Sequence, residues 1–209
     1  MIILEQYGIS LRRITEEDIE LIRIKRNDPA IRKRMAYRKK ISSSEQIAWF
    51  RSVNNKLNYY FLIFIGDESI GVINCKEVNV IDQVGEGGIF IWNEKYLRTP
   101  YPTFASLILL DFIFNELQIG NLSFARVLHS NEEAQRYNKM LGYVQLPKQG
   151  SVSNPWYVLS KETFNRKNKL LKKAAKSYSN SDGSLIVRGK PCSENLDELN
   201  TYLEENCSY

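Results

Sequence analysis

The sequence has few of the residues that carry disulfide, metal or histidine chemistry. Its 209 residues include one histidine and three cysteines, Cys75, Cys192 and Cys207. The cysteines are odd in number and lack paired spacing, so the sequence predicts neither a disulfide framework nor a metal site. Long apolar runs are also missing, because none reaches the roughly 20 residues that a membrane-spanning helix needs. We therefore expect a cytoplasmic protein without a membrane span.

The overall amino-acid composition is typical of a soluble globular protein. A hydrophobic content of 43% over 209 residues is enough for one well-buried domain. The net charge of +5 is concentrated in two basic blocks, at residues 23–40 and 161–176. Such blocks either bind phosphate groups or form solvated helix faces. Aromatic residues are not interleaved with the basic ones, so we expect no nucleic-acid partner.

Periodicity and capping residues predict the order of the elements. Strands are expected at 9–15, at 59–80 as two strands joined near Gly66, at 84–92, at 121–128, and in the segments YVQLP and PWYVLSKETF. Helices are expected after Thr15 with a break at Pro29, at 42–54, at 103–117 opening at Thr103, and at 131–142.

The segment SNEEAQRYNKMLGY, at residues 130–143, is the most informative part of the chain. Asn131 is suited to cap a helix, Ala134 follows one turn on, and Gly142 is suited to end the helix in the left-handed conformation. With the preceding strand, this segment resembles the closing half of the GNAT-type N-acetyltransferase fold, whose members commonly read NxxAxxxYxxxGF here. The resemblance implies an α/β (α+β) fold over residues 1–165, with a mixed, mostly antiparallel sheet and helices on both faces.

A C-terminal extension, residues 166–209, follows the expected domain. It consists of a basic helix or arm, a polar linker at 177–183 and an acidic segment at 193–206 with leucines at helical spacing. The acidic segment docks on the basic surface of its own chain, docks on a second subunit in a homodimer, or is a mobile appendage. The sequence leaves these three alternatives open.

The resemblance implies acetyl-CoA, or another acyl-CoA, as the cofactor. It would lie where the strand at 84–92 splays from the next strand, with free N–H groups near Phe90, Ile91 and Trp92 polarising the thioester carbonyl. Asn131 and Ala134 would contact the pantetheine. Glu86 is the candidate to relay the proton of the attacking amine, because many members carry a Glu at this point. The alternative is that this Glu is an edge-strand charge that discourages aggregation.

Two departures from the family pattern concern the cofactor. The loop YLRTPYPTFAS, residues 96–106, has no glycine and two prolines where the family presents successive N–H groups to a pyrophosphate. Arg98 and the helix start at Thr103 are the groups left to bind it. Asn138 stands where many members have the tyrosine that protonates the leaving thiolate. Tyr137, one residue earlier, is either the catalytic replacement or a packing residue.

A second resemblance lies in the N-terminal half. The segment KRNDPAIRKRM, residues 25–35, looks like part of the GNAT enzymes that acetylate nucleotide-linked amino sugars. Arg26 and Arg32 would hold a diphosphate by forked hydrogen bonds, and Trp49 or Phe50 would cover a ring. The alternative is that both aromatic residues are ordinary helix anchors.

These features together predict an acyl-CoA-dependent N-acyltransferase acting on a small amine, with a nucleotide-linked amino sugar as the first choice of acceptor. A protein or peptide N-acetyltransferase is the nearest alternative enzyme. A GNAT-like binding module that has lost catalysis is the alternative from another class, and the glycine-free loop is the feature that raises it.

Overall fold

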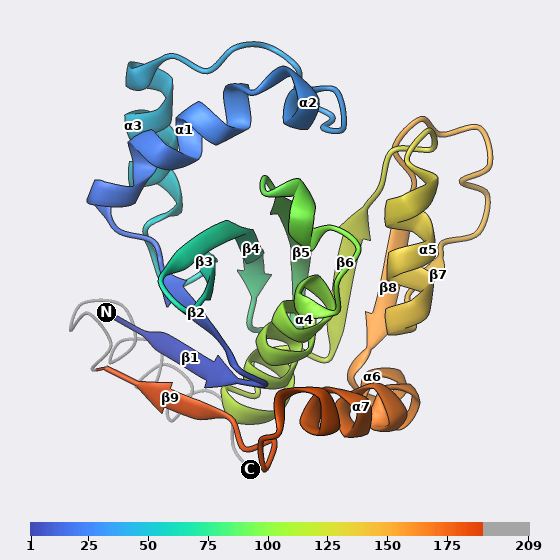
Figure 1. The fold of residues 1–209 in the computed structure, drawn as a ribbon. Helices are drawn as coiled ribbons and strands as arrows, with labels where there is room; N and C mark the ends of the chain where they lie inside the picture. Colours follow the sequence, from blue (N-terminus) through green and yellow to red (C-terminus); the bar gives the residue numbers. More distant parts are fainter. Residues whose placement is uncertain (190–209) are drawn as a thin grey trace.

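A single nine-stranded sheet organises the computed structural model, which describes residues 1–189 (Figure 1). The strands are β1 (Ile3–Gln6), β2 (Ile9–Arg13), β3 (Tyr59–Ile65), β4 (Glu68–Asn79), β5 (Val84–Ile91), β6 (Leu122–Arg126), β7 (Val144–Gln145), β8 (Trp156–Ser160) and β9 (Ile186–Arg188). The helices are α1 (Ile19–Asn27), α2 (Pro29–Arg32), α3 (Ser43–Val53), α4 (Tyr101–Asp111), α5 (Glu132–Leu141), α6 (Lys161–Lys167) and α7 (Lys169–Ser179). Short 3-10 turns at Glu16–Asp18 and Glu94–Tyr96 and a π-helical turn at Phe112–Glu116 complete the list.

The sheet is antiparallel except at one junction. Its order is β7-β8-β6-β5-β4-β3-β2-β1-β9, and β5 and β6 are the parallel neighbours. Their pairing runs from Val84–Leu122 to Glu86–Phe124, whereas β5 continues to Ile91. The two strands therefore diverge beyond Glu86 and leave a wedge between them. This mixed sheet confirms the predicted fold class.

Each face of the sheet has its own apolar core. On one face, α1 and α3 cover Leu62 and Val72 with Ile22 and Phe50. On the other, the almost wholly apolar α4 lies in the larger core, which also holds Phe61. Helices therefore cover both faces, as the resemblance implied.

Local signals place several elements where the sequence predicted them. Ser42 and Glu45 form a capping box that starts α3, and Pro29 separates α1 from α2. Asn131 Oδ1 accepts a hydrogen bond of 3.1 Å from the N–H of Ala134, and Gly142 ends α5 at a φ of +101°. These short-range signals set the position of the helix that borders the wedge.

The start of α4 differs from the prediction. The helix begins at Tyr101 with Pro100 as its N-cap residue, so the expectation that Thr103 opens it is wrong. Pro102 is buried in the first turn, where its missing N–H breaks no intrahelical bond. The two prolines thus start this helix instead of interrupting it.

The chain after residue 165 packs on the same sheet as far as it is described. Asn168 is fully buried and donates a hydrogen bond of 2.8 Å to the carbonyl of Leu141, and Ala175 of α7 belongs to the larger core. Strand β9, which the sequence analysis did not predict, pairs with β1. The acidic segment expected at 193–206 lies outside the described residues. Within residues 1–189, no helix is both long enough and apolar enough to cross a membrane.

Candidate functional site

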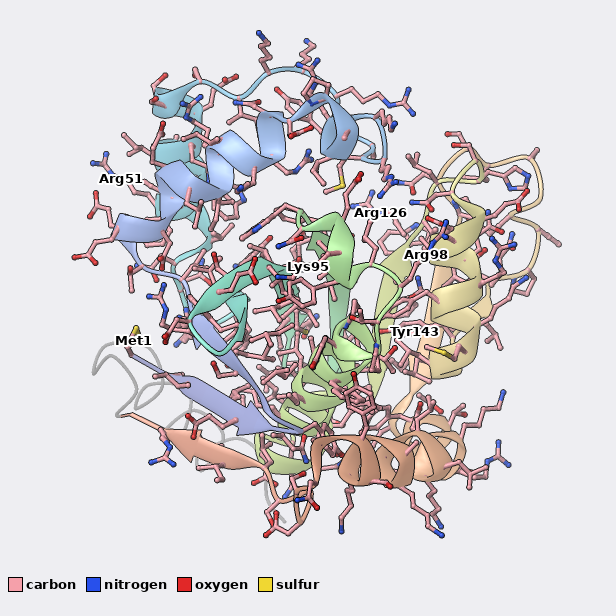
Figure 2. All side chains as sticks on the ribbon, viewed as in Figure 1. Met1, Arg51, Lys95, Arg98, Arg126 and Tyr143 are labelled. Atoms are coloured by element: carbon pink, nitrogen blue, oxygen red, sulfur yellow. The ribbon has the colours of Figure 1, made fainter. Side chains whose placement is uncertain are left out.

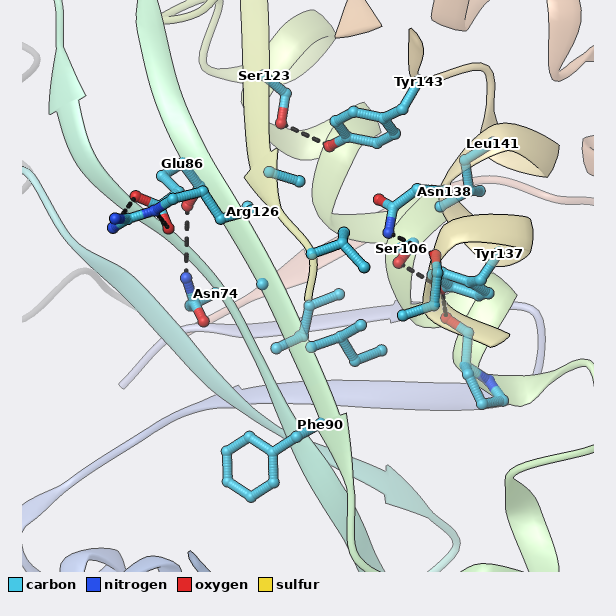
Figure 3. Close-up of a pocket in the computed structure, with 18 of the residues that line it drawn as sticks. Asn74, Glu86, Phe90, Ser106, Ser123, Arg126, Tyr137, Asn138, Leu141 and Tyr143 are labelled. Atoms are coloured by element: carbon cyan, nitrogen blue, oxygen red, sulfur yellow. Dashed lines mark hydrogen bonds and ion pairs between the residues drawn. The ribbon is translucent and has the colours of Figure 1, made fainter. Parts of the chain in front are cut away.

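A large cavity of about 1340 Å³ opens where β5 and β6 diverge (Figure 3). Its walls are β4, β5, β6, α4, α5 and the connection from α2 to α3. Glycines at positions 85, 87 and 88 line it, and they keep the β5 wall free of side chains beside the last residues paired with β6. The cavity therefore has an exposed strand edge along one side.

Strand β5 offers backbone donors to this cavity. The N–H of Trp92 donates to the carbonyl of Ile70 at 2.9 Å, on the β4 side. Because N–H groups alternate in direction along a strand, those of Ile89 and Ile91 point toward the β6 side, where the pairing has ended. The N–H of Trp92 is therefore not free, contrary to the expectation. Cofactor binding by Phe90, Ile91 and Trp92 stays a prediction.

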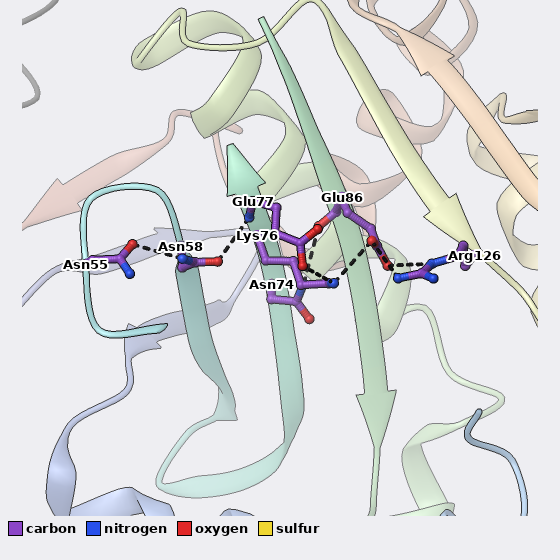
Figure 4. A network of polar contacts seen from close by, with 7 residues as sticks. All are labelled: Asn55, Asn58, Asn74, Lys76, Glu77, Glu86 and Arg126. Carbon is purple, nitrogen blue, oxygen red and sulfur yellow. Dashed lines mark hydrogen bonds and ion pairs between the residues drawn. The ribbon is translucent and has the colours of Figure 1, made fainter. Parts of the chain in front are cut away.

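Glu86 lies at the last paired position of β5, between two cations (Figure 4). Its Oε2 is 3.1 Å from Lys76 Nζ and 3.2 Å from a guanidinium nitrogen of Arg126. Lys76 also pairs with the exposed Glu77, at 2.8 Å. With Glu77, the two cations face two carboxylates, so the charges of this cluster balance. The proton-relay role of Glu86 stays a prediction.

The first turn of α5 lines the cavity with Asn131 and Ala134, as well as Asn138 one turn later. Asn138 is turned back on its own helix, because its Nδ2 donates to the carbonyl of Ala134 at 2.8 Å. Its side chain therefore stabilises the helix and offers no hydroxyl in place of the tyrosine that many members have.

Tyr137 also lines the cavity, but its proton is already engaged. Its hydroxyl donates to the carbonyl of Pro102 at 2.7 Å and lies 2.7 Å from Ser106 Oγ, which is thereby the donor to it. Burial raises the pKa of the Tyr137 hydroxyl. The residue therefore links α5 to the start of α4 by a hydrogen bond. Its catalytic role stays a prediction.

Sequence reasoning missed a second hydroxyl pair. Tyr143 and Ser123 are both buried, line the cavity, and lie 2.6 Å apart at their oxygen atoms. Burial raises the pKa of the Tyr143 hydroxyl. In the sequence, Tyr143 follows the glycine that ends a helix. An aromatic residue at that place indicates only core packing, so nothing in the sequence pointed to its hydroxyl.

At the other end of the cavity, Arg98 is exposed beside the N-terminus of α4 and lines the opening. Thr103 is in the first turn of α4 but outside the lining. Figure 2 shows Arg98 and Arg126 between the layer of α1–α3 and helix α5. Both cofactor assignments, Arg98 and Thr103, stay predictions.

The face toward α1 and α3 carries aromatic and basic side chains. The Arg26 guanidinium lies 5.9 Å from the centre of the Phe90 ring, and burial lowers its pKa. Trp49 packs edge-on against Tyr60, with ring centres 5.2 Å apart. Arg32 is outside the cavity lining, and Arg34, two residues on, is part of it. Substrate binding by Arg26, Arg32 and Trp49 stays a prediction.

A family model described as an acetyltransferase (GNAT) domain matches residues 9–144. The chain belongs to this family. The match confirms the predicted GNAT membership and an enzyme of the acetyltransferase class. No curated protein matches this GNAT chain by sequence.

Solved structures of similar fold include three acetyltransferases. A nucleotide-linked sugar GNAT, FdhC, is 21% identical with a TM-score of 0.67, covering 82% of this chain and 96% of its own. Spermidine N-acetyltransferase from Vibrio cholerae, in complex with CoA and spermine, is 16% identical with a TM-score of 0.64 over 76% and 98% of the two chains. The aminoglycoside acetyltransferase AAC(6')-Ib, in complex with coenzyme A, is 15% identical with a TM-score of 0.66 over 77% and 99%. At these identities the likeness shows the fold of this GNAT chain and leaves its acceptor open.

Proposed function

We propose that this GNAT chain transfers an acetyl group from acetyl-CoA to the amino group of a small, negatively charged acceptor, namely a nucleotide-linked amino sugar. The observation that carries the proposal is the set of basic side chains that line the cavity: Arg34, Lys76, Lys95, Arg98, Arg126 and Arg136. Three acidic side chains also line it: Glu86, Glu94 and Glu133. Lys76, Lys95 and Arg136 pair with carboxylates outside the lining, namely Glu77, Glu68 and Glu132, so the proposal rests on the arginines Arg34, Arg98 and Arg126.

These arginines distinguish among the acceptors named for the similar structures. Spermidine and aminoglycosides carry several positive charges, which arginines in the cavity repel. A nucleotide-linked sugar carries a diphosphate, which arginine binds through forked hydrogen bonds. Arg34 and Arg126 line the cavity, and Arg26 lies over the ring of Phe90, which also lines it. The arginines therefore support an anionic acceptor over a polyamine.

The cavity also fits coenzyme A. Its volume of about 1340 Å³ leaves room for the pantetheine arm, and the N–H groups of Ile89 and Ile91 are placed to pair with that arm as an added strand. Pro102 contributes no N–H, so the start of α4 offers fewer donors than a glycine loop would. Arg98 and Arg136 line the cavity and supply positive charge for the pyrophosphate in their place. When bound, acetyl-CoA supplies the acetyl group as a reactive thioester.

The residues that act on the acceptor amine and those that hold the cofactor would then lie on different walls of the cavity. Glu86 accepts the proton that the amine loses, directly or through a water molecule. Its contacts with Lys76 and Arg126 hold its side chain in place at the wall of the cavity. The N–H groups at the edge of β5 orient the thioester carbonyl. Asn131 and Ala134 border the pantetheine from α5.

Calorimetry with acetyl-CoA, followed by a thiol-release assay, tests the proposal. The acceptors to compare are a nucleotide-linked amino sugar, spermidine and a peptide with a free N-terminus. We expect turnover with the first and little with the other two. Absence of acetyl-CoA binding at millimolar concentration would contradict an acetyltransferase. Binding without turnover of any acceptor would favour the silent binding module, and preference for the peptide would favour a protein N-acetyltransferase.

A further inference from the structure

The Tyr143–Ser123 pair lies at the narrow end of the wedge, where β5 and β6 begin to separate. A Cβ atom built on Gly87, the first β5 residue after the last paired one, would lie 3.3 Å from both Tyr143 Oη and Ser123 Oγ. The hydroxyl pair is therefore next to the point where β5 and β6 separate. Any group that enters the wedge as far as Gly87 meets these two oxygens.

The pair lies on the opposite face of the sheet from Glu86. Ser123 is followed at alternate positions of β6 by Ala125, which belongs to the core around α4. Arg126, on the other face of β6, reaches Glu86 instead. In Figure 3 the Tyr143–Ser123 pair and the Glu86–Arg126 pair lie on either side of β6. An acceptor at Glu86 and a leaving group at Tyr143 would thus approach the reacting carbon from opposite sides.

From this geometry we propose that Tyr143 is a catalytic residue whose hydroxyl donates a hydrogen bond to the thioester sulfur and stabilises the thiolate as it leaves, with Ser123 positioning that hydroxyl. The proposal rests on the proposed function. Two properties of the site favour Tyr143 over Tyr137. The Tyr137 proton is engaged by the Pro102 carbonyl, whereas Tyr143 has a second hydroxyl, Ser123, as its partner, and either oxygen of that pair can be the donor. When Ser123 Oγ donates to Tyr143 Oη, the two hydroxyls stay hydrogen-bonded and the Tyr143 proton is free for another acceptor.

The protons and bonds of the step balance. The C–N bond of the amide forms as the C–S bond of the thioester breaks, and the electron pair stays on sulfur. The amine loses one proton to Glu86, which later releases it to solvent. The thiolate takes up one proton from solvent after it has left. Tyr143 keeps its own proton throughout, which suits a buried phenol whose pKa is raised by its surroundings.

The test compares the binding of CoA with that of desulfo-CoA, which lacks the sulfur atom, by calorimetry at neutral and mildly alkaline pH. At mildly alkaline pH, where the thiol of CoA begins to ionise, we expect the unmodified protein to bind CoA roughly tenfold more tightly than desulfo-CoA, because a hydrogen bond to a charged group is worth about that ratio or more. The preference should be smaller at neutral pH, where the thiol is protonated. Tyr143→Phe, which retains the ring, should bind both ligands equally. Its kcat should fall roughly tenfold to hundredfold, with the KM for acetyl-CoA little changed.

Tyr137→Phe is the matched control, since it removes another buried hydroxyl that lines the same cavity. It should weaken the binding of CoA and desulfo-CoA by the same factor. The double variant Ser123→Ala with Tyr143→Phe removes both hydroxyls. It checks that the fall in kcat in Tyr143→Phe is not caused by a Ser123 hydroxyl left without its partner. A sulfur preference that survives in Tyr143→Phe, or that is missing in the unmodified protein, overturns the role of Tyr143. Failure of both ligands to bind the unmodified protein overturns the proposed function itself.

Discussion

The hydroxyl of Tyr137 donates a hydrogen bond of 2.7 Å to the carbonyl oxygen of Pro102 and thereby joins α5 to the first turn of α4. These two helices border the cavity on the side opposite β5. The hydrogen bond is partly buried, so removing it leaves the carbonyl of the buried Pro102 without this partner. The relationship makes Tyr137 a residue that positions the start of α4.

Tyr137→Phe should therefore lower the free energy of unfolding by about 1 kcal/mol, a typical value for one buried hydrogen bond. The KM for acetyl-CoA should rise several-fold because Arg98 precedes the loosened turn, while kcat changes less. Denaturant titration and steady-state kinetics measure the two effects. A hundredfold fall in kcat at unchanged stability would instead support the catalytic role predicted for Tyr137.

Glu86→Gln tests the proton relay. The substitution keeps the shape of the side chain but removes its ability to accept a proton, so kcat should fall about a hundredfold or more. Glu77→Gln is the matched control, because Glu77 pairs with the same Lys76 at 2.8 Å and lies outside the cavity lining. It should leave kcat near that of the unmodified protein. Equal activity of Glu86→Gln and Glu77→Gln would show that Glu86 takes no part in proton transfer.

Arg126→Ala tests the anionic acceptor. Arg126 lies over the Trp156 ring at 4.6 Å and contributes positive charge beside Glu86. Its loss should raise the KM for a nucleotide-linked amino sugar roughly tenfold and weaken the dependence of that KM on salt. The KM for an uncharged amino sugar should not rise. Arg51→Ala, on the exposed side of α3, should change neither value.

The sequence predicted best where the signals are local. Asn131 and Gly142 bound α5 as expected, since a cap and a left-handed glycine act within a few residues. It failed where pairing is long-range. Strands β1 and β9 come from opposite ends of the chain and pair through backbone groups that carry no sequence signal. The register of β5 depends on its contact with β4, which is why the N–H of Trp92 donates to Ile70 and is not free.

Gly142→Ala should destabilise the protein at the end of α5. The φ of +101° is costly for any residue with a Cβ atom, and the added atom would lie 3.3 Å from Leu159 Cδ1. We expect a loss of about 1–2 kcal/mol in the free energy of unfolding. Gly150→Ala is the control, because a Cβ atom there meets nothing within 4 Å and the φ is not positive. Equal stability of the two variants would contradict this account.

Stability should fall at alkaline pH. Burial raises the pKa of Tyr60 from 10.0 to about 12, and the pKa of Tyr7 is also raised to about 12. Between pH 10.0 and about 12, these two tyrosines lose their protons in the unfolded chain and keep them in the folded chain. The contribution of both groups is therefore fully present below pH 10.0 and is lost as pH rises toward about 12. Denaturant titration between pH 8 and 11.5 measures the decline, within about two units of the ordinary tyrosine pKa. Tyr60→Phe removes one of the two groups, so its stability should decline less steeply than that of the unmodified protein. An equally steep decline in Tyr60→Phe would show that Tyr60 does not contribute.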